Sequence, residues 1–226
     1  MNVLVVAAHP DDELLGCGAT AARLAREGHS VYMAILGEGI TSRHSARESA
    51  DPAALESLRG CSQRVADLLG VKELFLHGLP DNRFDSLPLL NVIKVVEDLI
   101  ERCRPGAIYT HHGGDLNVDH QVVSRAVLTA TRPVEGHPVR ELYMFEIASS
   151  TEWAFQQLSP VFKPNVFVNV EETLSLKLEG MRQYESEIRK FPHPRSREAL
   201  TAIAQRWGSL VGFKAAEAFE AVRLIR

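Results

Sequence analysis

The first strongly apolar segment of the chain, residues 3–8, is an unbroken run of Val, Leu and Ala rather than an alternation of apolar and polar residues. Such runs are typical of strands that are buried on both faces, as in the middle of a parallel sheet. The run ends at His9, and residues 13–27 then place apolar side chains at helical spacing, with Gly28 where a helix C-cap belongs. Residues 30–36 form a second apolar run. The segment therefore predicts a β-α-β unit with a right-handed crossover.

The same alternation continues along the chain. We expect further strands over residues 73–76, 107–110, 142–147 and 166–170, and helices over 52–69, 88–102, 119–131, a long segment ending at Tyr184, and 196–207. Polar loops are expected at 37–51, 77–87 and 111–118, whereas residues 216–225 fit either a helix or a strand. No repeat or linker interrupts this pattern. We therefore predict a single Rossmann-like α/β domain over residues 1–226, with a mostly parallel twisted sheet flanked by helices.

Composition excludes several classes of protein. Of the 226 residues, 45% are hydrophobic and 24% are charged, which are ordinary values for a globular chain and exclude a disordered or collagen-like one. The 25 basic and 29 acidic side chains give a net charge of -4 with no basic stripe, so we expect no nucleic-acid partner. No stretch approaches the roughly 20 apolar residues that cross a membrane. A homo-oligomer remains open at this stage.

The cysteines indicate the redox environment. Cys17, Cys61 and Cys103 are widely spaced and contain no C-x-x-C pair, so neither a disulfide framework nor a cysteine zinc site fits them. The N-terminal residues have no basic start and carry acids where a signal peptide would continue. We therefore expect reduced thiols and a cytoplasmic protein.

Acids and imidazoles gather after three of the expected strands. These segments are His9-Pro10-Asp11-Asp12-Glu13, residues 77–83 and residues 111–120. Because ligands bind outside the carboxyl ends of parallel strands, we expect the active site at this edge of the sheet.

Three of these side chains fit a catalytic zinc site. His9 and Asp12 lie three residues apart in one turn, and His120 follows another strand. Three imidazole or carboxylate ligands leave a fourth position for water, and Asp11 lies beside them to take a proton. Without a metal, the same residues would form a polar turn in which an Asp caps a helix. Imidazole and carboxylate ligands also accept Fe²⁺ or Co²⁺.

These motifs carry a family resemblance that covers nearly the whole chain. Ala8-His9-Pro10-Asp11-Asp12-Glu13 after an N-terminal strand, with Asp119-His120 downstream, resembles the PIG-L/LmbE-like family of zinc-dependent N-acetylglucosaminyl deacetylases. Tyr184-Glu185-Ser186, residues 192–196 and residues 216–219 are also similar to members that act on sugars. The resemblance implies that His9, Asp12 and His120 bind zinc and that Asp11 is the general base.

One position departs from the family. Many members read His-Pro-Asp-His at the second motif, where this chain reads Asn117-Val118-Asp119-His120. The histidine that assists the transition state in those members is therefore Asn117 here, and either His112 or His193 could replace it. We favour His112 as a catalytic residue, because it follows a strand of the active edge, with Asp115 or Asp119 orienting its ring.

Several further residues are candidates for substrate binding. The family places an arginine near Arg59 against the substrate, although an exposed helical arginine fits equally. The other candidates are Asp81, Asn82, Arg83, Asp115, Asn117, His193 and Arg195. The turn-forming character of residues 81–83 alone would explain their presence. His29, His44 and His137 are expected to be surface or packing residues.

The combined prediction is a zinc-dependent amide hydrolase that removes acetyl from an N-acetylated amino sugar or its conjugate. The first alternative is a metal-dependent amidase acting on another sugar-linked amide, such as a thiol-sugar conjugate. The second is a metal- or carbohydrate-binding protein without catalysis, which would not need Asp11. A dinucleotide-binding oxidoreductase is disfavoured because Gly16-Cys17-Gly18 and Gly37-Glu38-Gly39 do not complete G-x-G-x-x-G.

Overall fold

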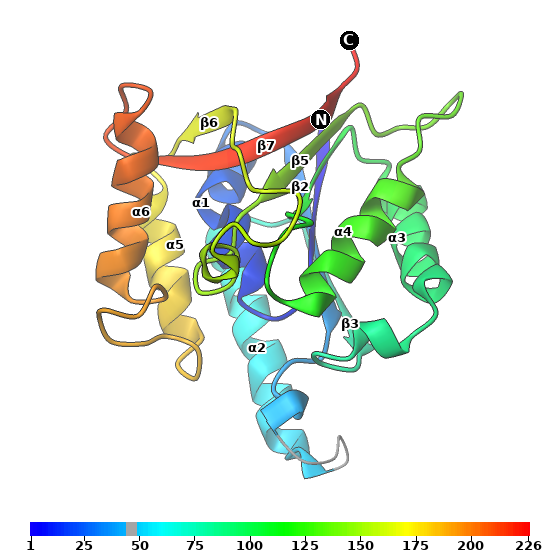
Figure 1. Ribbon diagram of the computed structural model, residues 1–226, viewed down its shortest axis with the longest axis horizontal. Helices are drawn as coiled ribbons and strands as arrows, with labels where there is room; N and C mark the ends of the chain where they lie inside the picture. The colour runs from blue at the N-terminus through cyan, green and yellow to red at the C-terminus, as the bar shows by residue number, and fades with distance from the viewer. Residues whose placement is uncertain (44–48) are drawn as a thin grey trace.

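A computed structural model describes residues 1–43 and 49–226 of the chain (Figure 1). Its strands form one sheet in the order β3-β2-β1-β4-β5-β7-β6. The strands are β1 Asn2–Ala7, β2 Ser30–Gly37, β3 Glu73–Leu79, β4 Ala107–His111, β5 Glu141–Phe145, β6 Val166–Asn169 and β7 Ala216–Leu224. Strands β1 to β5 pair in parallel, and β7 runs antiparallel to both β5 and β6. The expected mostly parallel sheet is confirmed.

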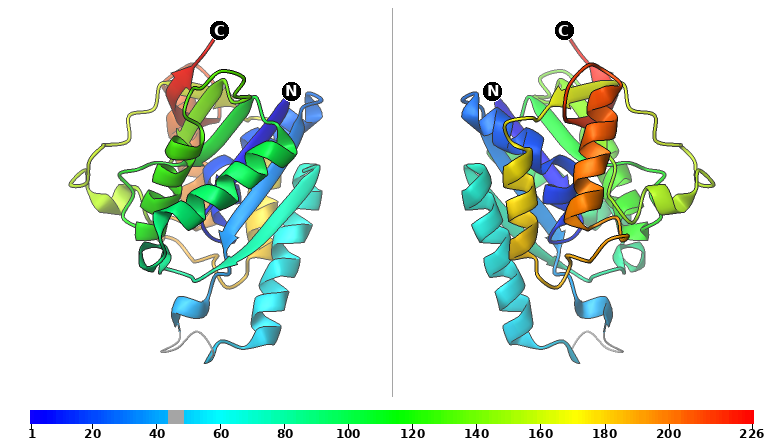
Figure 2. Two further views of the ribbon diagram at one scale, coloured as in Figure 1. Left: turned by 90° about the vertical axis from the view of Figure 1, so that its right-hand side faces the viewer. Right: turned by 90° about the vertical axis from the view of Figure 1, so that its left-hand side faces the viewer.

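Helices cover both faces of this sheet. They are α1 Asp12–Arg26, α2 Pro52–Leu69, α3 Leu89–Cys103, α4 Val118–Ala130, α5 Leu174–Gly180 and α6 Arg197–Ser209. Helices α1, α2, α5 and α6 lie on one side, and α3 and α4 on the other, as the two views of Figure 2 show. Short 3-10 turns lie at Thr41–Arg43, Phe84–Ser86, Glu152–Ala154 and Met181–Gln183. No helix in the described ranges combines the length and apolar character that spanning a bilayer requires.

The unbroken apolar run of β1 has a direct structural reason. Val3 and Val5 pack into the core beneath α1 and α2, whereas Leu4 and Val6 pack into the core beneath α3 and α4. Because successive strand side chains point to opposite faces, a central strand with both faces covered needs apolar residues at every position.

The structure departs from or completes the sequence-based expectation in several segments. The expected long helix is only α5, followed by the 3-10 turn Met181–Gln183, so the backbone turns at Tyr184. Residues 216–224 form a strand. Strands β3 and β4 extend beyond the expected ends, to Leu79 and His111. The loop expected at 37–51 is described only in part, and His44 lies outside the described residues.

The sheet order places a topological switch between β1 and β4. From β1 the chain continues to β2 and β3 on one side, then returns to β4 on the other side of β1. The loops that follow β1 and β4 therefore diverge, and a crevice opens at their carboxyl ends. His9 follows β1, and His120 lies in the first turn of α4, which follows β4.

Candidate metal centre

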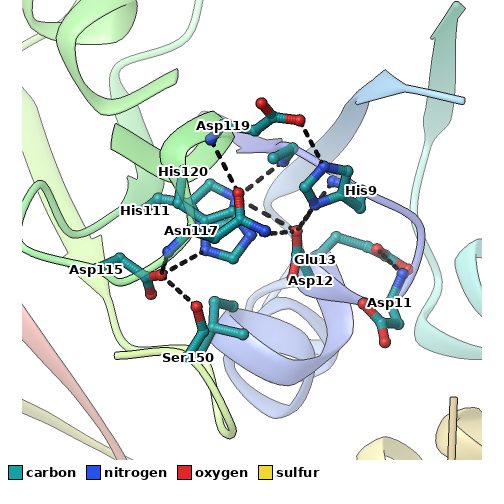
Figure 3. A network of polar contacts seen from close by, with 12 residues as sticks. His9, Asp11, Asp12, Glu13, His111, Asp115, Asn117, Asp119, His120 and Ser150 are labelled. Atoms are coloured by element: carbon teal, nitrogen blue, oxygen red, sulfur yellow. Dashed lines mark hydrogen bonds and ion pairs between the residues drawn. The ribbon is translucent and has the colours of Figure 1, made fainter. Parts of the chain in front are cut away.

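Three ligand atoms converge at this crevice. Asp12 Oδ2 lies 3.2 Å from His9 Nδ1 and 3.1 Å from His120 Nε2. The three atoms lie within 4.8 Å of one another (Figure 3). The structure thus brings together the two motifs that the sequence separates by more than a hundred residues.

The opposite nitrogen of each imidazole faces a carboxylate. His9 Nε2 lies 2.9 Å from Asp119 Oδ2, and His120 Nδ1 lies 3.0 Å from Asp115 Oδ1. A carboxylate behind a histidine holds the proton on that side, so the other nitrogen presents its lone pair to a metal. Each ring therefore turns its other nitrogen toward Asp12, in an arrangement that can hold a metal ion.

One buried nitrogen of this centre lacks a partner that a metal ion would provide. His120 Nε2 is buried, and its 3.1 Å contact with Asp12 Oδ2 lacks hydrogen-bond geometry, so this nitrogen has no hydrogen bond among the described residues. That is unusual for a buried polar atom. A metal ion held by two imidazole nitrogens and one carboxylate oxygen would satisfy it, and this donor set is one that zinc accepts.

The buried carboxylates around His9 and His120 favour positive charge on these two rings. Burial alone would lower the pKa of His9, but its contacts with Asp119 and Asp12 outweigh burial and raise it to about 10. Burial likewise opposes the charge on His120, yet Asp12 and Asp115 raise its pKa to about 9. Burial raises the pKa of Asp12, but the surrounding histidines hold it well below its usual range. The site attracts a cation.

The two supporting carboxylates are themselves anchored. Asp115 accepts hydrogen bonds from the Ser150 hydroxyl, from Thr151 Oγ1 at 2.6 Å and from Asn117 N at 2.9 Å. Burial raises the pKa of Asp115, but its contacts with His120, Ser150 and Thr151 lower it to about 2. Asp119 Oδ1 accepts from Phe84 N at 2.8 Å. Their positions are fixed by the segments after β3 and β5.

Asp11 lies beside the three ligands with an unusual backbone. It has φ 104°, in the left-handed region that a non-glycine residue rarely adopts. Its N–H donates to Glu13 Oε2 at 3.0 Å, and its Oδ2 accepts from Arg195 Nη1 at 2.7 Å. Burial raises the pKa of Asp11 well above its usual range, while the Arg195 guanidinium lowers it. Arg195 and Glu13 thus hold Asp11 beside the three candidate ligands, but Asp11 does not belong to that set.

A pocket of about 190 Å³ opens onto these residues. Besides Asp11 and the three ligands, it is lined by the expected residues Asp81, Asn82, Asn117 and Arg195. Asn117 caps α4, accepting from Asp119 N at 2.8 Å, and its Nδ2 donates to Asn82 Oδ1 at 2.9 Å. The amide of Asn117 thus occupies the rim of the pocket.

His112 does not reach this pocket. Its Nδ1 accepts from Gly114 N at 3.1 Å, its Nε2 lies 3.5 Å from Glu220 Oε2, and its ring packs edge-on against Phe162. The reason is the length of β4, which continues through His111 and so directs His111 and His112 to opposite faces. The prediction that His112 assists catalysis is corrected by these contacts.

Three other expected residues also lie outside the pocket lining. Arg59 and Arg83 are exposed, on α2 and on the loop before Phe84. His193 accepts from Arg195 N at 3.1 Å and contacts the Trp153 ring. His193 therefore lies next to the residue that holds Asp11.

Two neighbouring residues were missed by the sequence reasoning. His111 accepts from Ala8 N at 2.8 Å and stacks on His120, with ring centroids 4.0 Å apart. Burial lowers the pKa of His111 well below its usual value, so it is a neutral spacer. Glu13 supports the Asp11 backbone, and burial raises its pKa to about 7. Counting the strand alternation one residue past Thr110 would have identified His111.

Similar proteins are known. The profile of the PIG-L family, described as GlcNAc-PI de-N-acetylase, matches residues 4–131. The uncharacterized deacetylase YaiS of Escherichia coli is 30% identical over 197 residues, which cover 82% of this chain and 91% of that protein. Diacetylchitobiose deacetylase of Thermococcus kodakarensis is 25% identical over 236 residues, covering 96% and 81%.

A solved structure agrees with this relationship. The conserved protein TT1542 of Thermus thermophilus is 26% identical and superposes with a TM-score of 0.76, covering 99% of this chain and 95% of that chain. With the profile match and the 30% identical relative, the chain belongs to the PIG-L family.

Proposed function

We propose that this protein is a zinc-dependent deacetylase that hydrolyses the acetamide of an N-acetylated amino sugar or sugar conjugate. The products are acetate and the free amine. The observation that carries this proposal is the position of Asp11, which shares the pocket with the three ligands but does not belong to the ligand set. A protein that only stored a metal would not need a second carboxylate held in this way.

His9 Nδ1, Asp12 Oδ2 and His120 Nε2 would hold the zinc ion. Bound zinc would supply a Lewis acid that polarises the amide carbonyl and lowers the pKa of water to about 7. The ligand geometry is maintained by Asp115 and Asp119 on the far sides of the two rings.

Asp11 takes a proton from the attacking water and returns it to the amide nitrogen as the C–N bond breaks. Arg195 Nη1, at 2.7 Å, orients the Asp11 carboxylate, and Glu13 fixes its backbone. Asn117 offers the pocket a neutral amide in place of a second imidazole. This chain would therefore work without the histidine that many relatives carry at this position.

Release of acetate from a panel of N-acetylated sugars tests the proposal. The parent, loaded with zinc, should release stoichiometric acetate and amine. Asp11→Asn is nearly isosteric but accepts no proton at neutral pH, so the metal should stay bound while kcat falls by roughly 10²–10⁴. Asp85→Asn, an exposed carboxylate on the 3-10 turn after β3, is the matched control.

Two results would contradict the proposal. Near-parent turnover in Asp11→Asn would place the base elsewhere. Hydrolysis of a sugar-linked amide with a different acyl group, with no acetate released from any N-acetylated sugar, would instead favour the alternative amidase.

A further inference from the structure

A second cavity lies beneath α6, on the face of the sheet that α1, α2, α5 and α6 cover. It has a volume of about 230 Å³, and no described residue lines both this cavity and the metal pocket. Its walls come from α1, α5, α6, β7 and the segment after β5, and the right view of Figure 2 shows α5 and α6 side by side. We call it the α6 cavity. An apolar cavity of about 150 Å³ holds a molecule as large as benzene, so the α6 cavity has room for about nine non-hydrogen atoms.

Most of the wall of the α6 cavity is apolar. Leu15 and Gly16 come from α1, and Leu200, Ile203 and Ala204 come from α6. All of them except Ile203 are buried, and Ile203 is partly buried. Because apolar cavities of this kind take up apolar molecules in preference to water, the wall favours a ligand with an apolar body.

The charged side chains of the α6 cavity leave an excess of negative charge. They are Glu146, Glu152, Lys177, Arg206 and Glu217. Three carboxylates stand against two cations, so one carboxylate remains even if each cation neutralises one partner. The charge balance therefore favours a ligand that carries one positive charge.

Lys177 and Glu217 neutralise each other. Lys177 Nζ lies 2.6 Å from Glu217 Oε1 and donates to Leu15 O at 2.6 Å. Glu217 also accepts from Ala19 N at 3.2 Å and from Thr20 N at 2.7 Å. Since partners within the protein satisfy both charges, this pair does not recruit a ligand.

Glu146 is the carboxylate that lacks a cation. Its Oε1 accepts from Trp207 Nε1 at 2.5 Å, and no ion pair joins it to another of the described residues. Arg206 lies over the Trp207 ring instead, with its guanidinium carbon 4.5 Å from the ring centroid. Burial raises the pKa of Glu146, because its charged form is poorly solvated there. A cation beside Glu146 would stabilise that charged form.

A groove along residues 154–162 gives the α6 cavity an entrance. The residues that line both the groove and the cavity are Glu146, Glu152, Arg206 and Trp207. Glu152 is exposed and accepts from Ser149 N at 2.6 Å and from Ser150 N at 3.3 Å. Phe155, in the wall of the groove, is also exposed. A ligand can therefore enter from solvent past the charged residues and place its apolar end inside.

We propose that the α6 cavity binds a small apolar amine, with its ammonium group beside Glu146 and its apolar body between α1 and α6. An ammonium donates charge-assisted hydrogen bonds to a carboxylate, and these are stronger than hydrogen bonds between neutral groups. The apolar wall strengthens them further, because it excludes water. This site is separate from the metal pocket, so the inference does not depend on the proposed deacetylase reaction.

Three probes of nearly equal size and different charge provide the test. They are 2-phenylethylamine, 2-phenylethanol and phenylacetate, which are positive, neutral and negative at neutral pH. Each is titrated into the zinc-loaded protein, and its dissociation constant is obtained from NMR chemical-shift changes. The amine should bind roughly 10- to 100-fold more tightly than the alcohol, and phenylacetate should bind more weakly than either.

Substitution of Glu146 tests the charge of the site. Glu146→Gln keeps the size of the side chain and removes its charge. It should weaken binding of 2-phenylethylamine to the level of 2-phenylethanol and leave binding of the alcohol unchanged. Glu198→Gln removes an exposed carboxylate of α6 outside the cavity lining, and should bind all three probes like the parent.

Substitution of Ala204 tests the location. Ala204→Leu places three more carbon atoms in the cavity and should remove binding of all three probes, with thermal unfolding confirming that the variant is folded. Ala202→Leu adds the same atoms at an exposed position of α6 and should bind like the parent.

Three results would overturn the proposal. One is an absence of binding of 2-phenylethylamine to the parent. Another is an equal dissociation constant for the amine and the alcohol, or an amine affinity that Glu146→Gln leaves unchanged. The third is amine binding that persists in Ala204→Leu and disappears in His120→Ala, since this would place the amine on the metal ion.

Discussion

Tyr184 donates a hydrogen bond of 2.6 Å to Glu13 Oε1, although 171 positions separate the two residues. Glu13 uses its other oxygen to accept from the Asp11 N–H. The Tyr184 hydroxyl also lies 3.0 Å from Ser62 Oγ on α2. A chain of buried contacts thus runs from α2 to the backbone of the proposed base.

Tyr184→Phe should impair turnover without removing the metal. The substitution leaves Glu13 Oε1 buried without its donor, which costs about 1–3 kcal/mol of stability and loosens the strained turn at Asp11. Because a small displacement of a reacting group slows the reaction, kcat should fall by about 10-fold to 10²-fold. Steady-state kinetics and metal analysis of the same samples measure both effects.

Tyr143→Phe is the matched control. Tyr143 donates to Glu141 Oε2 at 2.8 Å, at the amino end of β5 and away from the crevice. It should lose stability but keep kcat. Equal kcat in Tyr184→Phe and the parent would show that Asp11 does not depend on this chain of contacts.

The metal ligands make a separate prediction. His9→Ala, Asp12→Ala and His120→Ala should each bind well below one equivalent of zinc, because each removes one of three protein ligands. Asp115→Asn keeps the ligands but weakens the orientation of His120, and should lower zinc affinity by about 10- to 100-fold.

Titration with a competing chelator gives these affinities. His137→Ala, whose ring contacts the backbone of Ala130 and Val139, should bind zinc like the parent. Retention of a full equivalent in all three ligand variants would remove the metal centre from this crevice.

His112→Ala should leave the pH–rate profile and the metal content unchanged. Its nitrogens face Gly114 and Glu220 rather than the pocket. The variant should nevertheless be less stable, by about 0.5–3 kcal/mol, because a buried ring is lost from its contact with Phe162. Loss of the basic limb of the profile in this variant would restore His112 to a catalytic role.

Glu146 makes stability depend on pH. Burial raises its pKa above the ordinary value, and the hydrogen bond from Trp207 Nε1 only partly offsets this. Folding raises the pKa of this carboxyl, so the folded state favours its protonated form. The folded protein therefore loses stability as pH rises above the pKa of the unfolded chain. Glu146→Gln should therefore gain in Tm relative to the parent as pH increases from about 4 to 8.

Thermal unfolding across this pH series measures the difference. Glu97→Gln, which removes an exposed carboxylate paired with Lys94 on α3, controls for the loss of one acidic side chain. A constant difference for Glu146→Gln would show that this carboxyl ionises normally in the folded protein.

The sequence predicted those parts of the site that depend on local pattern. The apolar run of β1 fixes a central strand, and the position of His9 directly after it places that ring in the crevice. Asp12 follows within one turn, and His120 within the first turn of α4. The end of β1 and the starts of α1 and α4 were thus predicted to within one residue.

The remaining parts depend on contacts that the local pattern does not contain. β4 continues one residue beyond the expected end, so that His111 faces His120 while His112 contacts Phe162 on the other side. Tyr184 was expected at the end of a helix, but its contact with Glu13 accompanies a turn there. The apolar residues of segment 216–224 fit a helix as well as a strand, and only its pairing with β5 and β6 decides for a strand.

The position of β7 also sets an order for folding during synthesis. β6 pairs only with β7 among the described strands, and α1 donates Ala19 N and Thr20 N to Glu217 of β7. The N-terminal β-α-β unit can assemble while the ribosome is still translating the chain. β6 cannot join the sheet, and α1 cannot form its hydrogen bonds to Glu217, until residues 216–224 have emerged from the exit tunnel.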